Sequence, residues 1–465
     1  MKKILTKALS LVICIGFTGL QMSLAQVLTT GKFAGEQILG GRGAVISGHT
    51  AGLYDRTTDL TNATLKFNAH TRIDWSRLNV DRGQSLYFNN GSYGVLNNVV
   101  GTSISKFAGI IKSDNGKIII SNPNGMIFNG GKFDGGSLLL TTKDLTGNNY
   151  QEGFNYNNLS VLDATNAGNT NYAVVAVIGG SEITSPDINI VANGVYFDNA
   201  TLSSPNANGV VLVTADGANF EVGKLVNMDG DLSYRLESAS VDQNNLYVAN
   251  TTIKGNPASN ATADKYGNIT FTSNKGVGIV DTTVTNSNLS VSNAGEDETI
   301  SISGLKTKGD VKLSADTVAV QTTANTTRND IKGNLTIEDN IYNTAQAPGA
   351  RLSSTDVSGK LNVTSKDSQS GIGNVVRITD VKAGETNVDA GTVYLTDVNL
   401  GKTNAKSSVA MVNVSGTSNF DTLDIDAATR VVLGSSTTAS KLQQTALTQR
   451  QQIQYVHQQI SLPAM

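Results

Sequence analysis

One short kind of segment recurs in the sequence from about Ser181 onward and limits the folds that the chain can adopt. Each copy alternates apolar and polar residues and ends in Asn, Asp, Ser or a small residue, as in the copies that begin at Asp187, Gly209, Asn268, Asn288, Asp310, Asn334 and Lys360. This alternation is typical of a β-strand with one buried face. Successive copies lie about 20–25 residues apart, or about twice that, which is the range of solenoid repeats. A unit this short cannot bury its apolar side alone, so the pattern predicts stacked β repeats.

The composition agrees with many short strands joined by many corners. Charged residues make up 16% of the chain, and 47 residues are Gly. Ordinary globular proteins carry more charge, about a quarter of their residues. Gly and Asn tolerate the left-handed backbone that tight corners need. The formal net charge is −3, and no cluster of basic residues indicates a nucleic-acid partner.

Two all-β architectures fit this pattern, a right-handed parallel β-helix and an antiparallel sandwich of hairpins. A sandwich needs Asn-Gly or Asp-Gly turns at short, regular spacing. Such pairs occur at Asn90-Gly91 and Asn115-Gly116, but most later copies are followed by a longer polar connection. We therefore predict a right-handed parallel β-helix with an N-terminal cap and a short C-terminal helix.

Both ends of a β-helix need protection, because a terminal coil exposes unpaired backbone groups. The first stretch after the leader departs from the repeat and contains Trp75, so it is expected to form the cap. The segment from Ser440 to Ile460 is rich in Gln, and its apolar residues fall on one helical face. It predicts a helix over the last coil or a tail, with a coiled-coil segment as the alternative.

The N-terminus reads as a secretory signal peptide. Lys2 and Lys3 precede an apolar run from Ala8 to Leu20, and small residues lead up to Ala25. The run is shorter than the roughly 20 residues that span a membrane. Cleavage is expected between Ala25 and Gln26. Cys14 is the only cysteine, so the mature chain would contain no disulfide.

A sharp corner interrupts the first half of the chain at Asn122-Pro123-Asn124-Gly125. It follows Ile118-Ile119-Ile120, a run that is apolar on both faces and therefore predicts a buried strand. Pro123 fixes its own φ and keeps the preceding residue extended, and Gly125 can take a positive φ. These residues predict a type I or type II turn, and by themselves they indicate a structural role.

Several motifs around this corner follow one another in a familiar order. They are Trp75–Val80, Leu96–Gly101, Ser113–Ile118, Asn122–Phe128 and Gly135–Leu138. Together they resemble the secretion domain of filamentous haemagglutinin-type exoproteins, the N-terminal region of two-partner-secreted proteins. The resemblance covers Gly31 to Leu212. Beyond Leu212 only the composition agrees.

The resemblance implies a right-handed β-helix and export through the general secretory route. It also implies passage through a dedicated outer-membrane transporter that has periplasmic binding domains. In this family the NPNG motif is tied to recognition by those domains or to folding of its own coil. These roles carry over to Asn122, Pro123, Asn124 and Gly125, with Asn115 and Gly116 as weaker candidates.

The resulting organisation has four parts. We expect a signal peptide at residues 1–25, a two-partner secretion domain at 26–212, a β-helical repeat rod at 213–436, and a Gln-rich amphipathic helix or tail at 437–465. The function expected is that of an adhesin or haemagglutinin, secreted or held on the surface of a Gram-negative-type bacterium after crossing the periplasm. Its partners would be the outer-membrane transporter, and then a host-cell glycan or protein, or other bacterial cells.

Two alternatives stay open beside the adhesin, a polysaccharide-acting β-helix enzyme and a truncated stalk of a longer exoprotein. Enzymes of that class need acids, a cation and a basic residue clustered on one face. Here the acids are scattered, and His49, His70 and His457 are far apart in the sequence. We therefore predict no enzymatic activity, no metal site and no cofactor.

Overall fold

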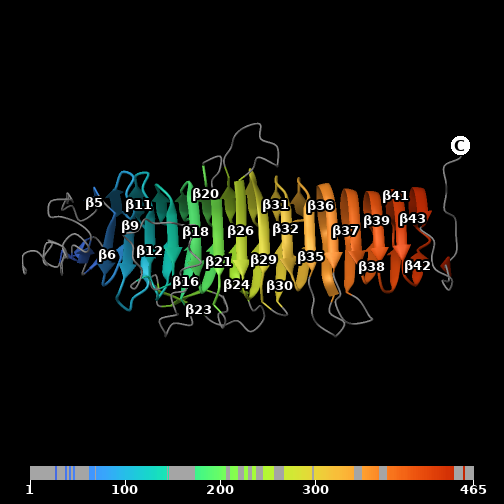
Figure 1. Ribbon diagram of the computed structural model, residues 1–465, viewed down its shortest axis with the longest axis horizontal. Helices are drawn as coiled ribbons and strands as arrows, with labels where there is room; N and C mark the ends of the chain where they lie inside the picture. Colours follow the sequence, from blue (N-terminus) through green and yellow to red (C-terminus); the bar gives the residue numbers. More distant parts are fainter. Residues whose placement is uncertain are drawn as a thin grey trace, which may run out of the picture. The chain divides into compact units, whose positions relative to one another are not determined.

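Every regular element that the structure describes is a β-strand (Figure 1). The structure is a computed structural model that describes residues 27–28, 37–38, 41–42, 45–47, 62–68, 70–143, 145, 173–205, 210–217, 225–228, 233–236, 244–255, 267–295, 298–339, 348–365, 374–444 and 454–455. No helix in these ranges is long and apolar enough to cross a membrane. The chain divides into two compact units, unit 1 with Met1–Val175 and Glu182–Ser185, and unit 2 with Ala176–Ser181 and Pro186–Met465.

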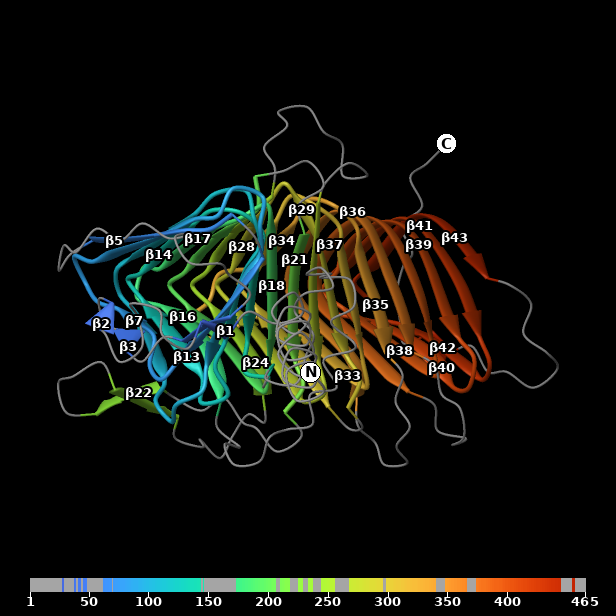
Figure 2. The ribbon, with the colours of Figure 1, turned by 60° about the vertical axis from the view of Figure 1, so that its left-hand side comes forward.

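Unit 1 is a stack of three-sided coils, in which each strand pairs in parallel with the strand one coil further along (Figure 2). We call the sides A, B and C in chain order. Side A contains β7 (Asn79–Val80), β10 (Ser105–Phe107) and β13 (Met126–Asn129). Side B contains β5 (Asn62–Lys66), β8 (Ser85–Asn89), β11 (Ile110–Ser113), β14 (Lys132–Asp134) and β17 (Glu182–Thr184). Side C contains β6 (Thr71–Trp75), β9 (Val95–Val99), β12 (Ile118–Ser121) and β15 (Leu138–Thr141).

Antiparallel strands cover the first edge of unit 1. β1 (Val27–Leu28) pairs with β4 (Val45–Ser47), and β4 pairs with β6. A separate hairpin joins β2 (Gln37–Ile38) to β3 (Gly41–Arg42). These strands form the cap that the sequence predicted. Trp75, however, lies on β6 in a parallel ladder with β9, so it belongs to the first coil and its assignment to the cap was wrong.

Unit 2 repeats the three-sided pattern. Side A contains β19 (Gly194–Asp198), β24 (Asn244–Ala249), β27 (Gly276–Val280), β30 (Thr299–Ser303) and β33 (Thr317–Val320). Side B contains β20 (Thr201–Ser203), β25 (Thr252–Lys254), β28 (Thr283–Thr285), β31 (Lys306–Thr307) and β34 (Asn329–Ile331). Side C contains β18 (Asp187–Ala192), β21 (Val210–Ala215), β26 (Gly267–Ser273), β29 (Ser287–Asn293), β32 (Val311–Ala315) and β35 (Leu335–Asp339). β16 (Val174–Ile178) has residues in both units, and β22 (Leu225–Met228) and β23 (Ser233–Leu236) form an antiparallel hairpin.

The later coils of unit 2 have longer strands. β36 (Pro348–Ser365) runs along all three sides, because it pairs in turn with β33, β34 and β35. After β37 (Val375–Ala390), sides B and C merge into one long strand per coil. These coils contain β38 (Thr392–Thr396), β39 (Asn399–Ser407), β40 (Met411–Ser415), β41 (Ser418–Ala427), β42 (Arg430–Leu433), β43 (Thr437–Gln444) and β44 (Gln454–Tyr455).

Columns of aliphatic side chains fill the interior, because the alternating residues of successive coils are in register. On side C of unit 2, Ile269, Leu289, Val311, Leu335 and Leu361 pair one above another, and each is at most 2% exposed. Burial of each such side chain contributes about 1.5–3 kcal/mol. The recurring segments of the sequence are therefore the side C strands.

The corner between sides A and B needs a left-handed residue in coil after coil. In unit 2 it contains Asn199, Asn250, Asp281 and Gly304, with φ of 52°, 48°, 41° and 69°. Glycine is favoured at Gly304, because a Cβ there would lie 2.2 Å from Oδ1 of Asp281. The Asn and Gly content of the chain thus reflects these corners.

The predicted C-terminal helix is wrong where the structure describes that segment. Thr437–Gln444 is strand β43, paired in parallel with β41, and Gln454–Tyr455 is strand β44, paired with β42. A short isolated helix is marginal in water. The edge of β41 offers a full row of backbone partners, and Ala439 and Leu442 can follow Phe420 and Leu423 in register. Pairing with the edge of β41 therefore outweighs the helical spacing of the apolar residues.

Candidate functional site

The candidate secretion motif forms the corner between sides C and A in unit 1. β12 is buried along its length, and the chain then turns at Asn122, whose carbonyl accepts a hydrogen bond from Gly125 N at 2.9 Å. Gly125 has a φ of 100°, and Asn124 is not among the residues with positive φ. The turn is therefore type I, since type II needs a positive φ at its third residue.

Asn122 uses its whole side-chain amide inside the fold. The residue is 0% exposed. Its Nδ2 donates to Ser103 O at 3.0 Å, just before β10, and to Ser105 Oγ at 2.9 Å, at the start of β10. Its Oδ1 accepts from Asn124 N at 2.9 Å and from Asn124 Nδ2 at 3.0 Å. The amide therefore ties its corner to the preceding coil.

Asn124 makes a second tie to the same coil. Its Nδ2 donates to Gly101 O at 2.7 Å as well as to Oδ1 of Asn122. Asn124 and Pro123 are only partly buried, so the outer surface of the corner consists of these two residues. The motif thus has a buried half that joins coils and a solvent-facing half.

Gly125 sits where no larger residue fits. A Cβ at this position would lie 2.9 Å from Val174 O and 3.0 Å from Val174 N. Both the positive φ and the close backbone favour glycine. Gly125 directly precedes β13. The carbonyl of Gly125 accepts a hydrogen bond from Ser105 N at 3.1 Å.

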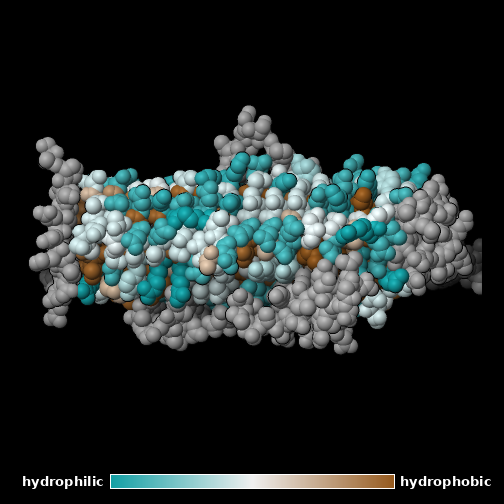
Figure 3. Space-filling model, turned by 180° about the vertical axis from the view of Figure 1, so that it is seen from behind, coloured by the Kyte–Doolittle hydropathy of each residue, from teal (hydrophilic) through white to brown (hydrophobic). Residues whose placement is uncertain are grey.

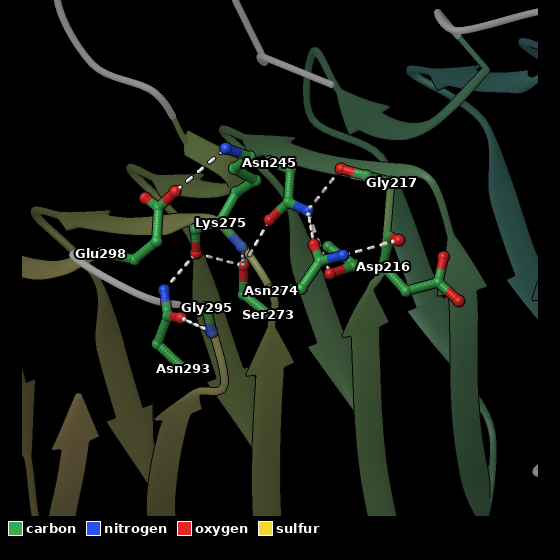
Figure 4. Close-up of polar contacts among 10 residues, drawn as sticks. Asp216, Gly217, Asn245, Ser273, Asn274, Lys275, Asn293, Gly295 and Glu298 are labelled. Atoms are coloured by element: carbon green, nitrogen blue, oxygen red, sulfur yellow. Dashed lines mark hydrogen bonds and ion pairs between the residues drawn. The ribbon is translucent and has the colours of Figure 1, made fainter. Parts of the chain in front are cut away.

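The equivalent corner of unit 2 uses the same kind of asparagine bond without the NPNG motif (Figure 4). Asn274 Nδ2 donates to Asp216 O at 2.8 Å, and Asn293 Nδ2 donates to Lys275 O, in each case one coil back. Asn245 is 0% exposed and bonds Ala215 O and Asn274 Oδ1. Asparagine amides that cross between coils are therefore a general device of this corner, which favours a folding role for Asn122.

The weaker candidates, Asn115 and Gly116, lie at the other end of β12, on the corner between sides B and C. Gly116 is buried, and a Cβ there would lie 2.0 Å from Tyr93 O. Asn115 is exposed. Gly136 stacks on the pair one coil later, because a Cβ there would lie 2.1 Å from Gly116 O. The two candidate motifs therefore do not form one site.

The sequence did not single out Asn97 as a site residue, but it is a partner of the tryptophan in the same set of motifs. Trp75 is fully buried and donates from Nε1 to Asn97 Oδ1 at 3.1 Å, and Asn97 Nδ2 donates to Ile119 O at 3.2 Å. This bridge spans three coils of side C. A buried Trp followed one repeat later by Asn is the signal that could have found it.

No group of three or more His, Cys, Asp or Glu able to hold a metal ion occurs within the described ranges. His70 accepts a hydrogen bond at Nδ1 from Gly94 N at 2.9 Å and packs edge-on against Tyr93. His49 and His457, and the expected cleavage site at Ala25 and Gln26, lie outside the described residues.

Comparison with known families identifies the family of the chain. A family model described as the TPS secretion domain matches residues 57–299. The chain belongs to the TPS secretion domain family. Domains of this family belong to exoproteins that leave the cell by two-partner secretion, so the chain is an exported protein, secreted or surface-associated, that interacts with an outer-membrane transporter. The TPS secretion domain family is a family of secreted exoproteins and not of enzymes.

One solved structure is similar to this chain at low sequence identity. The crystal structure of the HMW1 secretion domain from Haemophilus influenzae is 14% identical, with a TM-score of 0.45. The alignment covers 87% of this chain and 100% of that one. A search of curated protein sequences gives no match to this chain.

Proposed function

We propose that this chain is an adhesin-type exoprotein whose export depends on the corner Asn122–Gly125. One observation supports this most strongly. The amide of Asn122 is completely buried and satisfied by four hydrogen bonds, two of them to the preceding coil. The corner therefore acts first by locking an early coil of unit 1. Pro123 and Asn124 form the part that a periplasmic domain of the transporter could contact.

Replacement of both asparagines by alanine tests the role in export. In Asn122→Ala/Asn124→Ala, the buried hydroxyl of Ser105 and the carbonyls of Ser103 and Gly101 lose their donors, and the loss at the buried hydroxyl costs about 1–3 kcal/mol. We expect the surface or medium fraction to fall severalfold in cells that express the transporter, with the chain retained in the periplasm or degraded. Immunoblots of the cell fractions measure this.

A matched variant separates the corner from a loss of asparagine in general. Asn399→Ala/Asn419→Ala removes two exposed asparagines of unit 2 and should leave export unchanged. Normal export of the Asn122→Ala/Asn124→Ala chain would refute the proposed role. A variant that keeps native protease resistance but is not exported would show that the corner is recognised directly.

The adhesin role rests on the export of the chain and on its polar outer faces. On the face that Figure 3 shows, hydrophobic residues form small separate patches among hydrophilic ones. Large exposed apolar side chains in the described ranges are Tyr93, Val100, Ile110 and Leu212. Surfaces rich in hydroxyl and amide groups suit glycans or protein backbones on host cells or other bacteria. Beads coated with the purified chain should adhere to such cells, and a lack of adherence to every cell type tried would contradict the role.

A further inference from the structure

Side C of unit 2 carries a groove that the secretion motif does not explain. It has a volume of about 490 Å³ and runs across β26, β29, β32, β35 and β36. The first four of these strands lie side by side in Figure 1. At about 4.8 Å per strand, five strands give a groove about 19 Å long. Its lining includes Ser290, Lys312, Thr336, Lys360 and Asn362.

The fold itself uses the acceptor atoms along one wall of the groove. Asn288 Oδ1 accepts from Asp310 N at 2.9 Å, Asp310 Oδ1 accepts from Asn334 N at 2.8 Å, and Asn334 Oδ1 accepts from Lys360 N at 2.8 Å. Each oxygen thus caps the next coil. Asp310, the carboxylate in the lining, also accepts from Asn334 Nδ2 at 3.1 Å. These bonds occupy the side-chain oxygens of Asn288 and Asn334 and one of the two carboxylate oxygens of Asp310.

An amide ladder directs a further donor to the far end of the groove. Asn404 Nδ2 donates to Asn387 Oδ1 at 2.8 Å, and Asn387 Nδ2 donates to Asn362 Oδ1 at 3.0 Å. The ladder therefore has a direction, and it ends at the amide nitrogen of Asn362, which lines the groove. Hydrogen bonds in a chain polarise one another, so this terminal N–H₂ is a stronger donor than an isolated one.

Two lysine ammonium groups give the groove positive charge, and each is paired with a glutamate that a ligand can replace. Lys312 pairs with Glu338 at 3.0 Å, and Lys360 pairs with Glu385 at 3.1 Å. All four side chains are at least one-third exposed, and neither glutamate lines the groove. Exposed ion pairs of this kind contribute little, so an anionic ligand in the groove can replace the glutamates.

We propose that this groove binds an acidic polysaccharide, a chain of sugars that carry carboxylates. Lys312, Lys360 and Asn362 would contact the carboxylates, and Ser290 and Thr336 the hydroxyls. An extended peptide would need pockets for its side chains. The apolar residues of the groove, Leu289 and Val311, are only 2% and 1% exposed and offer none. The proposal rests on the adhesin role and names the class of its ligand.

Binding measurements on the full mature chain test this without the transporter, so a failure of export cannot affect the result. Polygalacturonate serves as the acidic probe and dextran as the neutral one, each measured by calorimetry at low and high salt. We expect binding of polygalacturonate alone, weakened by salt. Lys312→Ala/Lys360→Ala should reduce the affinity at least about tenfold, since charge-assisted bonds are lost. Asn362→Asp should reduce it similarly, because a repelling carboxylate replaces the donor.

The control removes the same charge from the neighbouring side. Lys306→Ala/Lys382→Ala replaces two exposed lysines of side B and should leave the affinity unchanged. An equal effect of this control, or no binding of polygalacturonate at all, would overturn the proposal. Equally tight binding of dextran would show that charge is irrelevant. Equally tight binding of polyglutamate, lost in the same variants, would assign the groove to acidic peptides instead.

Discussion

Single side chains at the corners decide how one coil attaches to the next. Local rules predicted the turn at Asn122–Gly125 and the positive φ of Gly125, because Pro123 and Gly125 restrict the backbone directly. The bond from Asn122 to Ser103 and Ser105 could not be predicted from those rules. Ser103 and Ser105 are 19 and 17 residues away in the sequence, and only the register of the coils brings them close to Asn122.

Gly125 gives the first prediction at this scale. Gly125→Ala forces a positive φ on a side chain and places its Cβ 2.9 Å from Val174 O. We expect unit 1 to lose about 1–3 kcal/mol of stability, measured by urea unfolding. Gly91→Ala is the control, because Gly91 also has a positive φ but nothing lies within 4 Å of its Cβ position. If the two variants were equally stable, the close packing at Gly125 would be unimportant.

Tyr196 gives a pH-dependent prediction. Burial, and then the charges of Asp198 and Tyr247, raise the pKa of Tyr196 from 10.0 to about 12. The unfolded chain therefore loses this proton first, so the stabilisation is complete below pH 10 and is lost as the pH rises towards 12. Urea unfolding at several alkaline pH values should show a smaller fall in stability for Tyr196→Phe. An identical fall in both proteins would contradict the raised pKa.

At the scale of the strand and its corners, the periodic segments predicted side C best. Buried residues alternate with more exposed ones throughout β32 and β35, over the last six residues of β26 and over the first six of β29. Side B strands are often only two or three residues long, which is too short for a periodic pattern to appear in the sequence. Side B was therefore not predicted. The merging of sides B and C after β37 is also invisible locally, since it depends on which neighbouring edge each strand meets.

Asn250 tests the left-handed corner between sides A and B. Asn250→Val places a β-branched residue at a φ of 48° and should destabilise its coil by about 2 kcal/mol. Asn250→Gly tolerates this φ and should change stability by less than about 1 kcal/mol. Hydrogen exchange of the amides in β24 and β27 reports the local effect. Equal protection in both variants would show that the left-handed residue is not required.

At the scale of the whole molecule, each unit depends on contacts between neighbouring coils. Stability of such a stack is approximately a sum of coil and interface terms, and its exposed ends are its weak points. The helical spacing of Ser440–Ile460 misled the sequence prediction for this reason. The spacing of apolar residues reflects this segment alone. Thr437–Gln444 forms a strand because it pairs with the exposed edge of β41.

The cap of unit 1 gives the prediction at this scale. β4 occupies the edge of β6 through Val45–Asp74, Ile46–Ile73 and Ser47–Arg72. A mature chain that lacks residues 26–47 should expose this edge and associate through it. Light scattering should show a mass that rises with protein concentration, whereas the chain with the cap stays constant. A truncated chain with the same mass at every concentration would show that β6 needs no cover.

The corner between sides C and A has one more property. In unit 2 a single residue, Asn193, separates β18 from β19, whereas β21 and β24 are separated by the whole stretch from Asp216 to Gln243. The strands on either side still pair without a shift, Ala192 with Ala215 and Val195 with Leu246. The register of the strands is therefore fixed along the sides, whereas the length of the connection at this corner is not. Insertions at this corner can lengthen the chain without changing how the strands of the coils pair.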